Sequence, residues 1–187
     1  MKEAIFKSAI LVGVPHVIEA SFALKVATEG TPDYDTSFVR EGLDDCSHTG
    51  NVNENQQRGL RGLERVYRAQ YGPISSKMAE SMAEIKWMSE HITYGLFLEP
   101  VSESNPRAPL TFAETEMVVL SCLIAQRSKR EVLWHLRGAL RSGLSSDEVE
   151  AVQSAVELVA TEIAGIDLKT GMPRVVEVTE EDDLSGL

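Results

Sequence analysis

The sequence predicts an all-α protein with six or seven helices. Apolar residues recur every three or four positions along most of the chain, which is the spacing that places them on one face of an α-helix. Capping boxes, glycines and prolines bound these stretches, as they do at helix ends. No strand patterns alternate with the helical ones, and no Asn-Gly turn joins two strand-like runs. The pattern therefore favours helix-on-helix packing.

The length and composition favour one domain, residues 1–187. With 43% apolar and 25% charged residues among 187, the chain can bury one sizeable core. No apolar run approaches the length of a membrane span, and the first residues do not resemble a signal peptide. We therefore expect a cytoplasmic protein that does not bind membranes. The net charge of −11 also repels nucleic acid, so we expect no nucleic-acid partner.

The chain begins with a predicted pair of helices within residues 1–28. The first helical pattern, over 3–12, stops at Gly13, and Pro15 suits the first turn of the second helix. From 29 to 54 the composition shifts to Gly, Thr, Pro, Asp, Asn and Ser without a sustained period, so we expect a long loop. An arm that wraps a partner subunit is the alternative.

Core helices are expected between residues 55 and 168. The first covers about 55–70 and ends at Tyr71-Gly72-Pro73, and the second covers about 75–93 and ends at Tyr94-Gly95. The apolar spacing of the second helix predicts an inner face made of Met78, Met82, Ile85, Met88 and Ile92. Trp87 and His91 lie one turn apart on its flank.

Two capping boxes mark later helix starts. Thr111 is followed three residues on by Glu114, and Ser145 by Glu148, so each hydroxyl can accept from a first-turn amide while the glutamate reaches back. Gly165 ends the last helix. Residues 169–187 are expected to form a tail, with a short extended arm at 175–178 and a disordered acidic end.

The best catalytic candidates lie on the helix predicted for residues 127–143. Its apolar residues share one side, and Glu131, His135 and Gly138 form a stripe along the border of that side. Glu131 lies one turn before His135, so we expect its carboxylate to orient and charge the imidazole. We expect His135 at the edge of a pocket. Arg137 and Arg141 are expected on the solvated far side.

The cysteines predict no metal site and no disulfide. Cys46 and Cys122 are far apart, form no CxxC motif and have no histidine pair at zinc spacing. We therefore expect no metal and no cofactor.

The stretch from Ile85 to Gly165 resembles the carboxymuconolactone decarboxylase family, part of the alkylhydroperoxidase D-like superfamily. The resemblance rests on Glu131-x-x-x-His135-Leu-Arg-Gly-Ala-Leu-Arg-Ser-Gly-Leu-Ser-x-x-Glu148-Val, and on Tyr94-Gly95, Leu110-Thr111 and Ala164-Gly165. It implies an alkylhydroperoxidase D-like helical bundle that assembles into a homo-oligomer, with a cofactor-free pocket between helices.

The resemblance also implies site residues. The superfamily's two thiol positions are occupied here by Ser128 and Glu131, which argues against a thiol peroxidase, whereas its glutamate position matches Glu116. The implied catalytic set is Glu116, Glu131 and His135. The residues expected to contact substrate are Trp134, Arg130, Arg127, Tyr94 and His91.

The expected activity is that of a small-molecule lyase or isomerase. Decarboxylation, double-bond migration and lactone opening each need a proton transfer and a stabilised enolate, which an imidazole and a carboxylate can provide. The arginines of 127–141 suit an acidic or phenolic substrate. The alternative is a non-catalytic helical oligomer that retains the fold.

Overall fold

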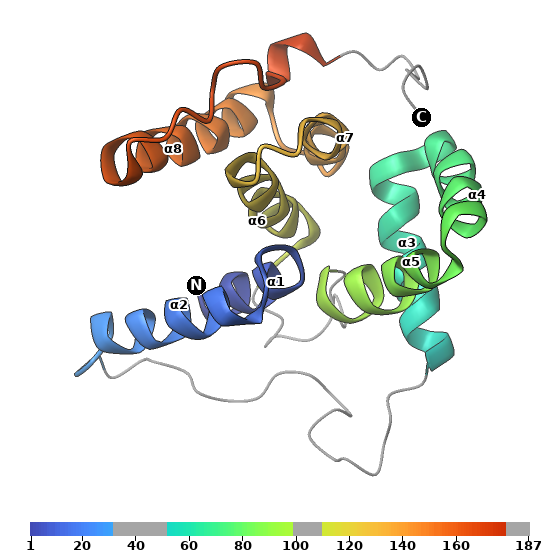
Figure 1. Cartoon of the computed structure of the whole chain (residues 1–187), viewed down its shortest axis with the longest axis horizontal. Coiled ribbons are helices and arrows are strands. Elements are labelled where there is room, and N and C mark those ends of the chain that lie inside the picture. The colour runs from blue at the N-terminus through green and yellow to red at the C-terminus, as the bar shows by residue number, and fades with distance from the viewer. Residues whose placement is uncertain (32–51, 99–109, 179–187) are drawn as a thin grey trace.

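The structure is a computed structural model that describes residues 1–31, 52–98 and 110–178. In these ranges all regular secondary structure is helical and no strand is present, which confirms the all-α prediction (Figure 1). The α-helices are α1 (Lys2–Val12), α2 (Val14–Ala27), α3 (Val52–Tyr67), α4 (Tyr71–Ser81), α5 (Ala83–Trp87), α6 (Phe112–Ala125), α7 (Lys129–Arg141) and α8 (Ser146–Ala164). A π-helix, η2 (Met88–Leu98), continues α5, and η1 (Arg68–Gln70) and η3 (Val175–Glu177) are 3₁₀ turns.

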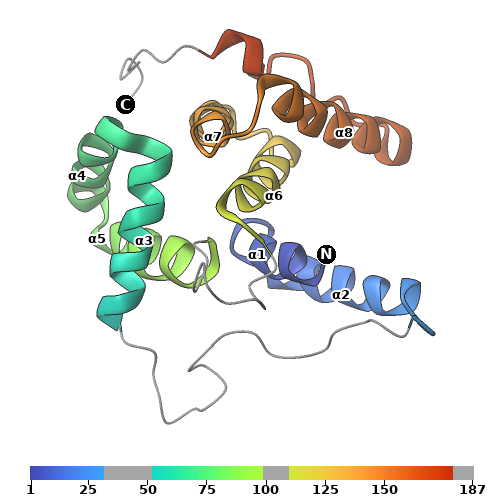
Figure 2. The same ribbon diagram turned by 180° about the vertical axis from the view of Figure 1, so that it is seen from behind.

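The helix α6 lies at the centre of the molecule. It contacts α1 on one side and α7 and α8 on the other, while α3 packs against η2 and α7 (Figures 1 and 2). The core joins these helices through apolar side chains that are at most 2% exposed, among them Leu63, Val66, Val119, Leu120, Ile124, Val132, Leu136, Ala139 and Val149. The α6–α7 contact is where the candidate site forms.

Two glycines allow α3 and η2 to pack backbone to backbone. A Cβ atom added at Gly59 would lie 1.9 Å from the carbonyl oxygen of Glu90, and one at Gly95 would lie 2.3 Å from that of Asn55. Side chains cannot be accommodated at such distances. Gly95 therefore serves close packing inside a helix, and the prediction that Tyr94-Gly95 ends a helix is wrong.

The predicted caps are confirmed. The hydroxyls of Thr111 and Ser145 accept hydrogen bonds from the amides of Glu114 and Glu148, and both glutamates reach back to form complete capping boxes. Gly165 follows α8 in the left-handed conformation, with φ of 64°. Pro15 stands in the first turn of α2, as expected.

The single helix predicted for 75–93 is wrong. Met82 adopts an extended conformation, with φ of −164° and ψ of 101°, and separates α4 from α5. The change of direction leaves part of the expected inner face exposed: Met82 is 53%, Ile85 41% and Met88 39% exposed. Tyr71-Gly72-Pro73 does mark a break, through η1, but it also opens α4.

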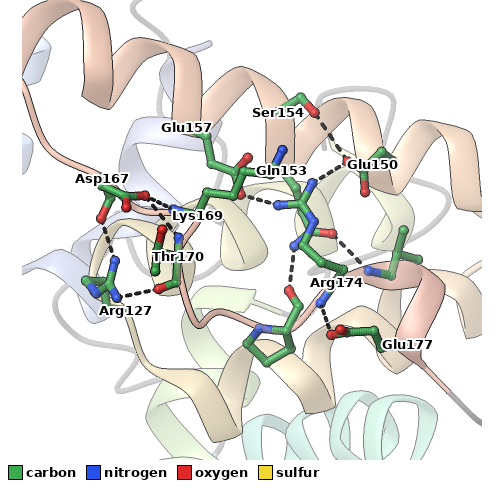
Figure 3. Close-up of polar contacts among 12 residues, drawn as sticks. Arg127, Glu150, Gln153, Ser154, Glu157, Asp167, Lys169, Thr170, Arg174 and Glu177 are labelled. Carbon is green, nitrogen blue, oxygen red and sulfur yellow. Dashed lines mark hydrogen bonds and ion pairs between the residues drawn. The ribbon is translucent and has the colours of Figure 1, made fainter.

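The start of the tail packs against α8 (Figure 3). Residues 175–178 were expected to be extended, yet Val175–Glu177 form a 3₁₀ turn and Val175 is 3% exposed. Gln153 holds this segment because its amide donates to the Pro173 carbonyl and accepts from the Val175 amide. Arg174 pairs with Glu150 and Glu157 of α8.

Part of the predicted loop lies outside the described residues. Residues 32–51 of the 29–54 segment are not described, whereas Val52 to Glu54 already belong to α3. Residues 179–187, with the acidic end of the tail, also lie outside. Across the described ranges, no helix combines the length and apolarity that a membrane crossing needs.

Candidate functional site

The site is centred on His135, which α7 directs into the protein. Its neighbours on the inner side of α7, Val132, Leu136 and Ala139, are fully buried, and His135 itself is 4% exposed. Its Nδ1 lies 2.9 Å from Oε2 of Glu116. Glu116, on the facing helix α6, is 1% exposed. The α6–α7 contact therefore buries an imidazole and a carboxylate as a hydrogen-bonded pair.

Two tyrosine hydroxyls face the other ring nitrogen. The hydroxyls of Tyr67, at the end of α3, and Tyr94, on η2, each lie 3.3 Å from Nε2 of His135. The Tyr94 hydroxyl also donates to that of Tyr67 over 3.4 Å. The Tyr67 ring stands edge-on to the imidazole, with centroids 5.9 Å apart. Four helical segments thus converge on one histidine.

This arrangement is suited to moving a proton. The Glu116 carboxylate accepts a hydrogen bond from Nδ1–H, which leaves the lone pair of Nε2 free to accept a hydrogen bond from a hydroxyl. When Nε2 gains a proton, the resulting imidazolium lies directly beside the Glu116 carboxylate, which stabilises its charge. Burial raises the pKa of the Tyr67 hydroxyl above its ordinary value, so Tyr67 keeps its proton at neutral pH.

Gly138 makes room for the Glu116 carboxylate. A Cβ atom at position 138 would lie 2.7 Å from Oε2 of Glu116 and 2.9 Å from Cγ1 of Val66. The carboxylate that accepts from His135 therefore occupies space that any other residue at 138 would fill.

A cleft of about 290 Å³ lies beside this group, between α7 and the segments α4 and α5. It is lined by Ile74, Lys77, Met78, Ser81, Met82, Ile85, Arg130, Glu131 and Trp134. Trp134 connects the cleft to the histidine because its indole meets the Tyr67 ring edge-on, with centroids 5.5 Å apart. The cleft combines an apolar wall with two cationic side chains, Lys77 and Arg130.

The predicted pairing of Glu131 with His135 is wrong. Glu116 holds the imidazole, whereas Glu131 lines the cleft. His135 itself was expected at a pocket edge, but its ring is enclosed and does not line the cleft. The reason is the rotation of α7, which directs position 135 toward α6 and positions 130, 131 and 134 toward α4 and α5.

The other predicted site residues divide into separate groups. Tyr94 joins His135, and Arg130 and Trp134 line the cleft. Arg127 does neither, because its guanidinium donates to the carbonyls of Asp167 and Thr170 and holds the loop after α8 (Figure 3). His91 is buried and stacks on Trp87, with ring centroids 5.3 Å apart, and it is not among the residues lining the cleft.

The expectation that Arg137 and Arg141 are solvated is also wrong. Arg137 is 5% exposed, and Arg141 donates to the backbone carbonyl of Val66 over 2.5 Å. Arg137 is therefore buried and Arg141 contacts the backbone of α3, so they do not form a solvated outer face of α7.

The chain is similar to two curated proteins that share one name. It is 25% identical over 169 residues to Peroxisomal protein 2 of Schizosaccharomyces pombe, an alignment covering 90% of this chain and 72% of the relative. It is 24% identical over 193 residues to Peroxisomal protein 2 of Saccharomyces cerevisiae, covering 93% of this chain and 65% of the relative. The chain therefore spans under two thirds of the length of the second relative. No family model and no solved structure matches the chain.

Sequence reasoning missed Tyr67 and Lys77. Tyr67 fits the apolar spacing of its helix and is 68 residues from His135, so no local motif joins the two. The available signal was its hydroxyl, because a buried tyrosine needs a polar partner. Lys77 gave no signal, since its place in the cleft depends on the break at Met82.

In the described part of the chain, no three His, Cys, Asp or Glu side chains gather as metal ligands would. Cys122 is buried in α6, and burial raises the pKa of its thiol to about 11, which keeps it protonated at neutral pH. Cys46 lies outside the described residues.

Proposed function

We propose that the protein is a cofactor-free lyase or isomerase that moves a proton beside a carbonyl or lactone group of a small molecule. The observation that carries this proposal is the placement of His135 between a buried carboxylate at Nδ1 and two hydroxyls at Nε2. Such a set can take a proton from carbon and return it elsewhere. The hydroxyls can also donate to the enolate oxygen that forms.

The cleft supports an acidic or phenolic substrate. Lys77 and Arg130 can receive a carboxylate or a phenolate, and Trp134, Met78 and Ile85 offer an apolar surface for the rest of the molecule. Its volume of about 290 Å³ suits a small metabolite more than a polymer. The resemblance to the carboxymuconolactone decarboxylase family agrees with this reaction class.

We also propose that the protein forms a homo-oligomer. On α2, the residues Val14, Ile18, Phe22 and Val26 recur every four positions and are 44% to 72% exposed. No residue of α2 is buried in the single chain. Contact with further copies would remove this apolar stripe from water.

A peroxisomal location is the better proposal than a cytoplasmic one. Its support is that both similar proteins carry a peroxisomal name at about a quarter identity over most of this chain. Fluorescence microscopy of the tagged full chain beside a peroxisomal marker tests it, and a diffuse signal would contradict it.

The competing function is a non-catalytic helical oligomer. The observation favouring it is that both nitrogens of His135 already have protein partners and the ring lies outside the cleft. A buried polar group whose hydrogen bonds are all satisfied by the protein can have a purely structural role, in which it specifies how the helices pack.

Hydrogen exchange separates the two functions. The purified chain is incubated in heavy water with keto acids, enol lactones and phenolic acids, and NMR follows deuterium entering the carbon beside the carbonyl. An enzyme of the proposed class catalyses exchange or conversion of at least one member, with chelator present. Exchange no faster than with heat-denatured protein across the set would support the non-catalytic oligomer.

A further inference from the structure

We propose that Tyr67 is the residue that exchanges a proton with the substrate, while His135 and Glu116 act behind it as proton acceptor and counter-charge. This proposal rests on the proposed function and assigns the reacting group of that site. Tyr94 is a positioning residue that orients the Tyr67 hydroxyl.

The first argument is access. Glu116 occupies Nδ1 of His135 at 2.9 Å, and the two hydroxyls cover Nε2 at 3.3 Å each. A substrate atom cannot meet either nitrogen without displacing one of these groups. The Tyr67 ring contacts both the imidazole and the Trp134 indole, and Trp134 lines the cleft, so Tyr67 links the histidine to the cleft wall. A molecule in the cleft that turns the Trp134 side chain aside meets Tyr67 before His135.

The second argument is the direction of the hydrogen bonds. With Nδ1–H donated to Glu116, the imidazole offers one lone pair, at Nε2, and only one hydroxyl can donate to it fully. Since Tyr94 donates to the Tyr67 oxygen, the Tyr67 proton is the one directed at Nε2. The chain therefore runs from Tyr94 through Tyr67 and His135 to Glu116. The two tyrosines are equally distant from Nε2 and yet have different roles.

The proposed proton transfer involves the substrate carbon, the Tyr67 oxygen and Nε2 of His135. The carbon–hydrogen bond beside the substrate carbonyl breaks, and its proton forms a new bond to the Tyr67 oxygen as the original Tyr67 proton passes to Nε2. The electron pair left on carbon moves into the enolate, and the imidazolium is balanced by the Glu116 carboxylate. Where the enolate is conjugated to a further double bond, the same steps run in reverse at its far carbon deliver the proton there and shift the double bond. This concerted path avoids a free phenolate in a buried site, where burial disfavours that charge.

Matched variants test the assignment. Tyr67→Phe and Tyr94→Phe each remove one hydroxyl at the same distance from Nε2, and His135→Gln removes the acceptor. We expect Tyr67→Phe to lower turnover by about 10²-fold or more, as His135→Gln does. The double variant that combines Tyr67→Phe with His135→Gln should be no slower than either of these single variants, because Tyr67 and His135 act as a unit. Tyr94→Phe should cost about tenfold or less, the worth of one neutral hydrogen bond.

Each outcome decides between the proposals. If His135→Gln is inactive while Tyr67→Phe remains within about tenfold of the wild type, this assignment is overturned and the proposed function stands. If the wild type moves no proton, or His135→Gln retains full turnover, both fall. Should Tyr67→Phe fail to fold, Tyr67→3-fluorotyrosine keeps the volume and the hydrogen bond but makes the hydroxyl more acidic. It should change the rate and its solvent isotope effect, whereas the same replacement at Tyr94 should change neither, and equal effects at both positions would contradict the assignment.

Discussion

The pair formed by Glu116 and His135 is the chemical centre of the site. Both residues are at most 4% exposed, so neither can exchange its partner for water. Removing one member of a buried pair leaves the other uncompensated, at a cost of about 3–5 kcal/mol. Glu131 has no such constraint because it faces the cleft. The two glutamates therefore invite a direct comparison.

We expect Glu116→Gln to lower turnover by about 10²-fold or more, because the neutral amide no longer stabilises the imidazolium. Glu131→Gln should affect substrate binding more than turnover. The measurement is kcat and KM for both variants. A larger loss of kcat in Glu131→Gln than in Glu116→Gln would show that the residue one turn away on α7 is the true partner of His135.

Gly138→Ala tests the packing around the carboxylate. The added methyl group would lie 2.7 Å from Oε2 of Glu116, so the carboxylate must move away from His135. We expect a loss of stability of about 1–3 kcal/mol together with a loss of turnover. Gly72→Ala is the control, since a Cβ atom there meets nothing within 4 Å. Equal behaviour of the two variants in thermal unfolding would contradict this view of Gly138.

The residues of the site were predictable only where a local pattern marked them. His135 and Glu116 stood out through the helical stripe and the family resemblance. The identity of their partners did not, because Tyr67 is 68 residues from His135 and the pairing depends on how α3 packs against α7. Glu131 was predicted to be the partner of His135 because of its spacing along one helix. In the structure, the packing of α6 against α7 brings Glu116 to His135 instead.

At the scale of elements, local hydrogen bonds made the helix starts predictable. Both capping boxes use residues three positions apart, so the sequence alone specifies them. The break at Met82 and the π-helix after it have no such local cause. The π-helix packs against the distant α3, where Gly59 and Gly95 let two backbones meet. Sequence periodicity cannot register a contact between distant segments.

The capping carboxylates predict a loss of stability in acid. Hydrogen bonds from Thr111 hold the pKa of Glu114 below its ordinary value, and those from Ser145 do the same for Glu148. Hydrogen bonds from Thr170 and Lys169 lower the pKa of Asp167 to about 2. Since the folded values lie below the unfolded ones, this stabilisation is present above about pH 4 and is lost as the pH falls through the folded values.

Melting temperatures between about pH 6 and pH 2 check this prediction. Glu114→Gln should melt below the wild type at the upper end, and the difference should close as Glu114 of the wild type becomes protonated. A difference that stays constant across the range would mean that the charge of Glu114 is irrelevant to its cap.

At the scale of the molecule, two apolar surfaces remain exposed in the single chain. One is the stripe on α2, and the other covers the end of α8 and the turn after it, where Leu158, Val159, Ile163 and Ile166 are 50% to 81% exposed. Both helices extend outward from α6 (Figures 1 and 2). Contiguous apolar surface of this kind marks a protein contact more often than free surface.

We expect Phe22→Glu to reduce the oligomer to smaller species, because it places a charge in the middle of the α2 stripe. Ala20→Glu is the control, since it adds the same charge to an exposed position on the opposite side of the helix. Light scattering at micromolar concentration gives the masses. A monomeric wild type, or equal masses for both variants, would contradict the assignment of this surface.

The most direct test of the account is the rate of carbon–hydrogen exchange in heavy water for the wild type and His135→Gln, with melting temperatures measured beside it. If His135 accepts the Tyr67 proton as Tyr67 takes up the proton of the substrate, the variant keeps its fold and assembly and exchanges at least about 10²-fold more slowly. Unchanged exchange in a folded His135→Gln protein would contradict the account and make the histidine a structural residue.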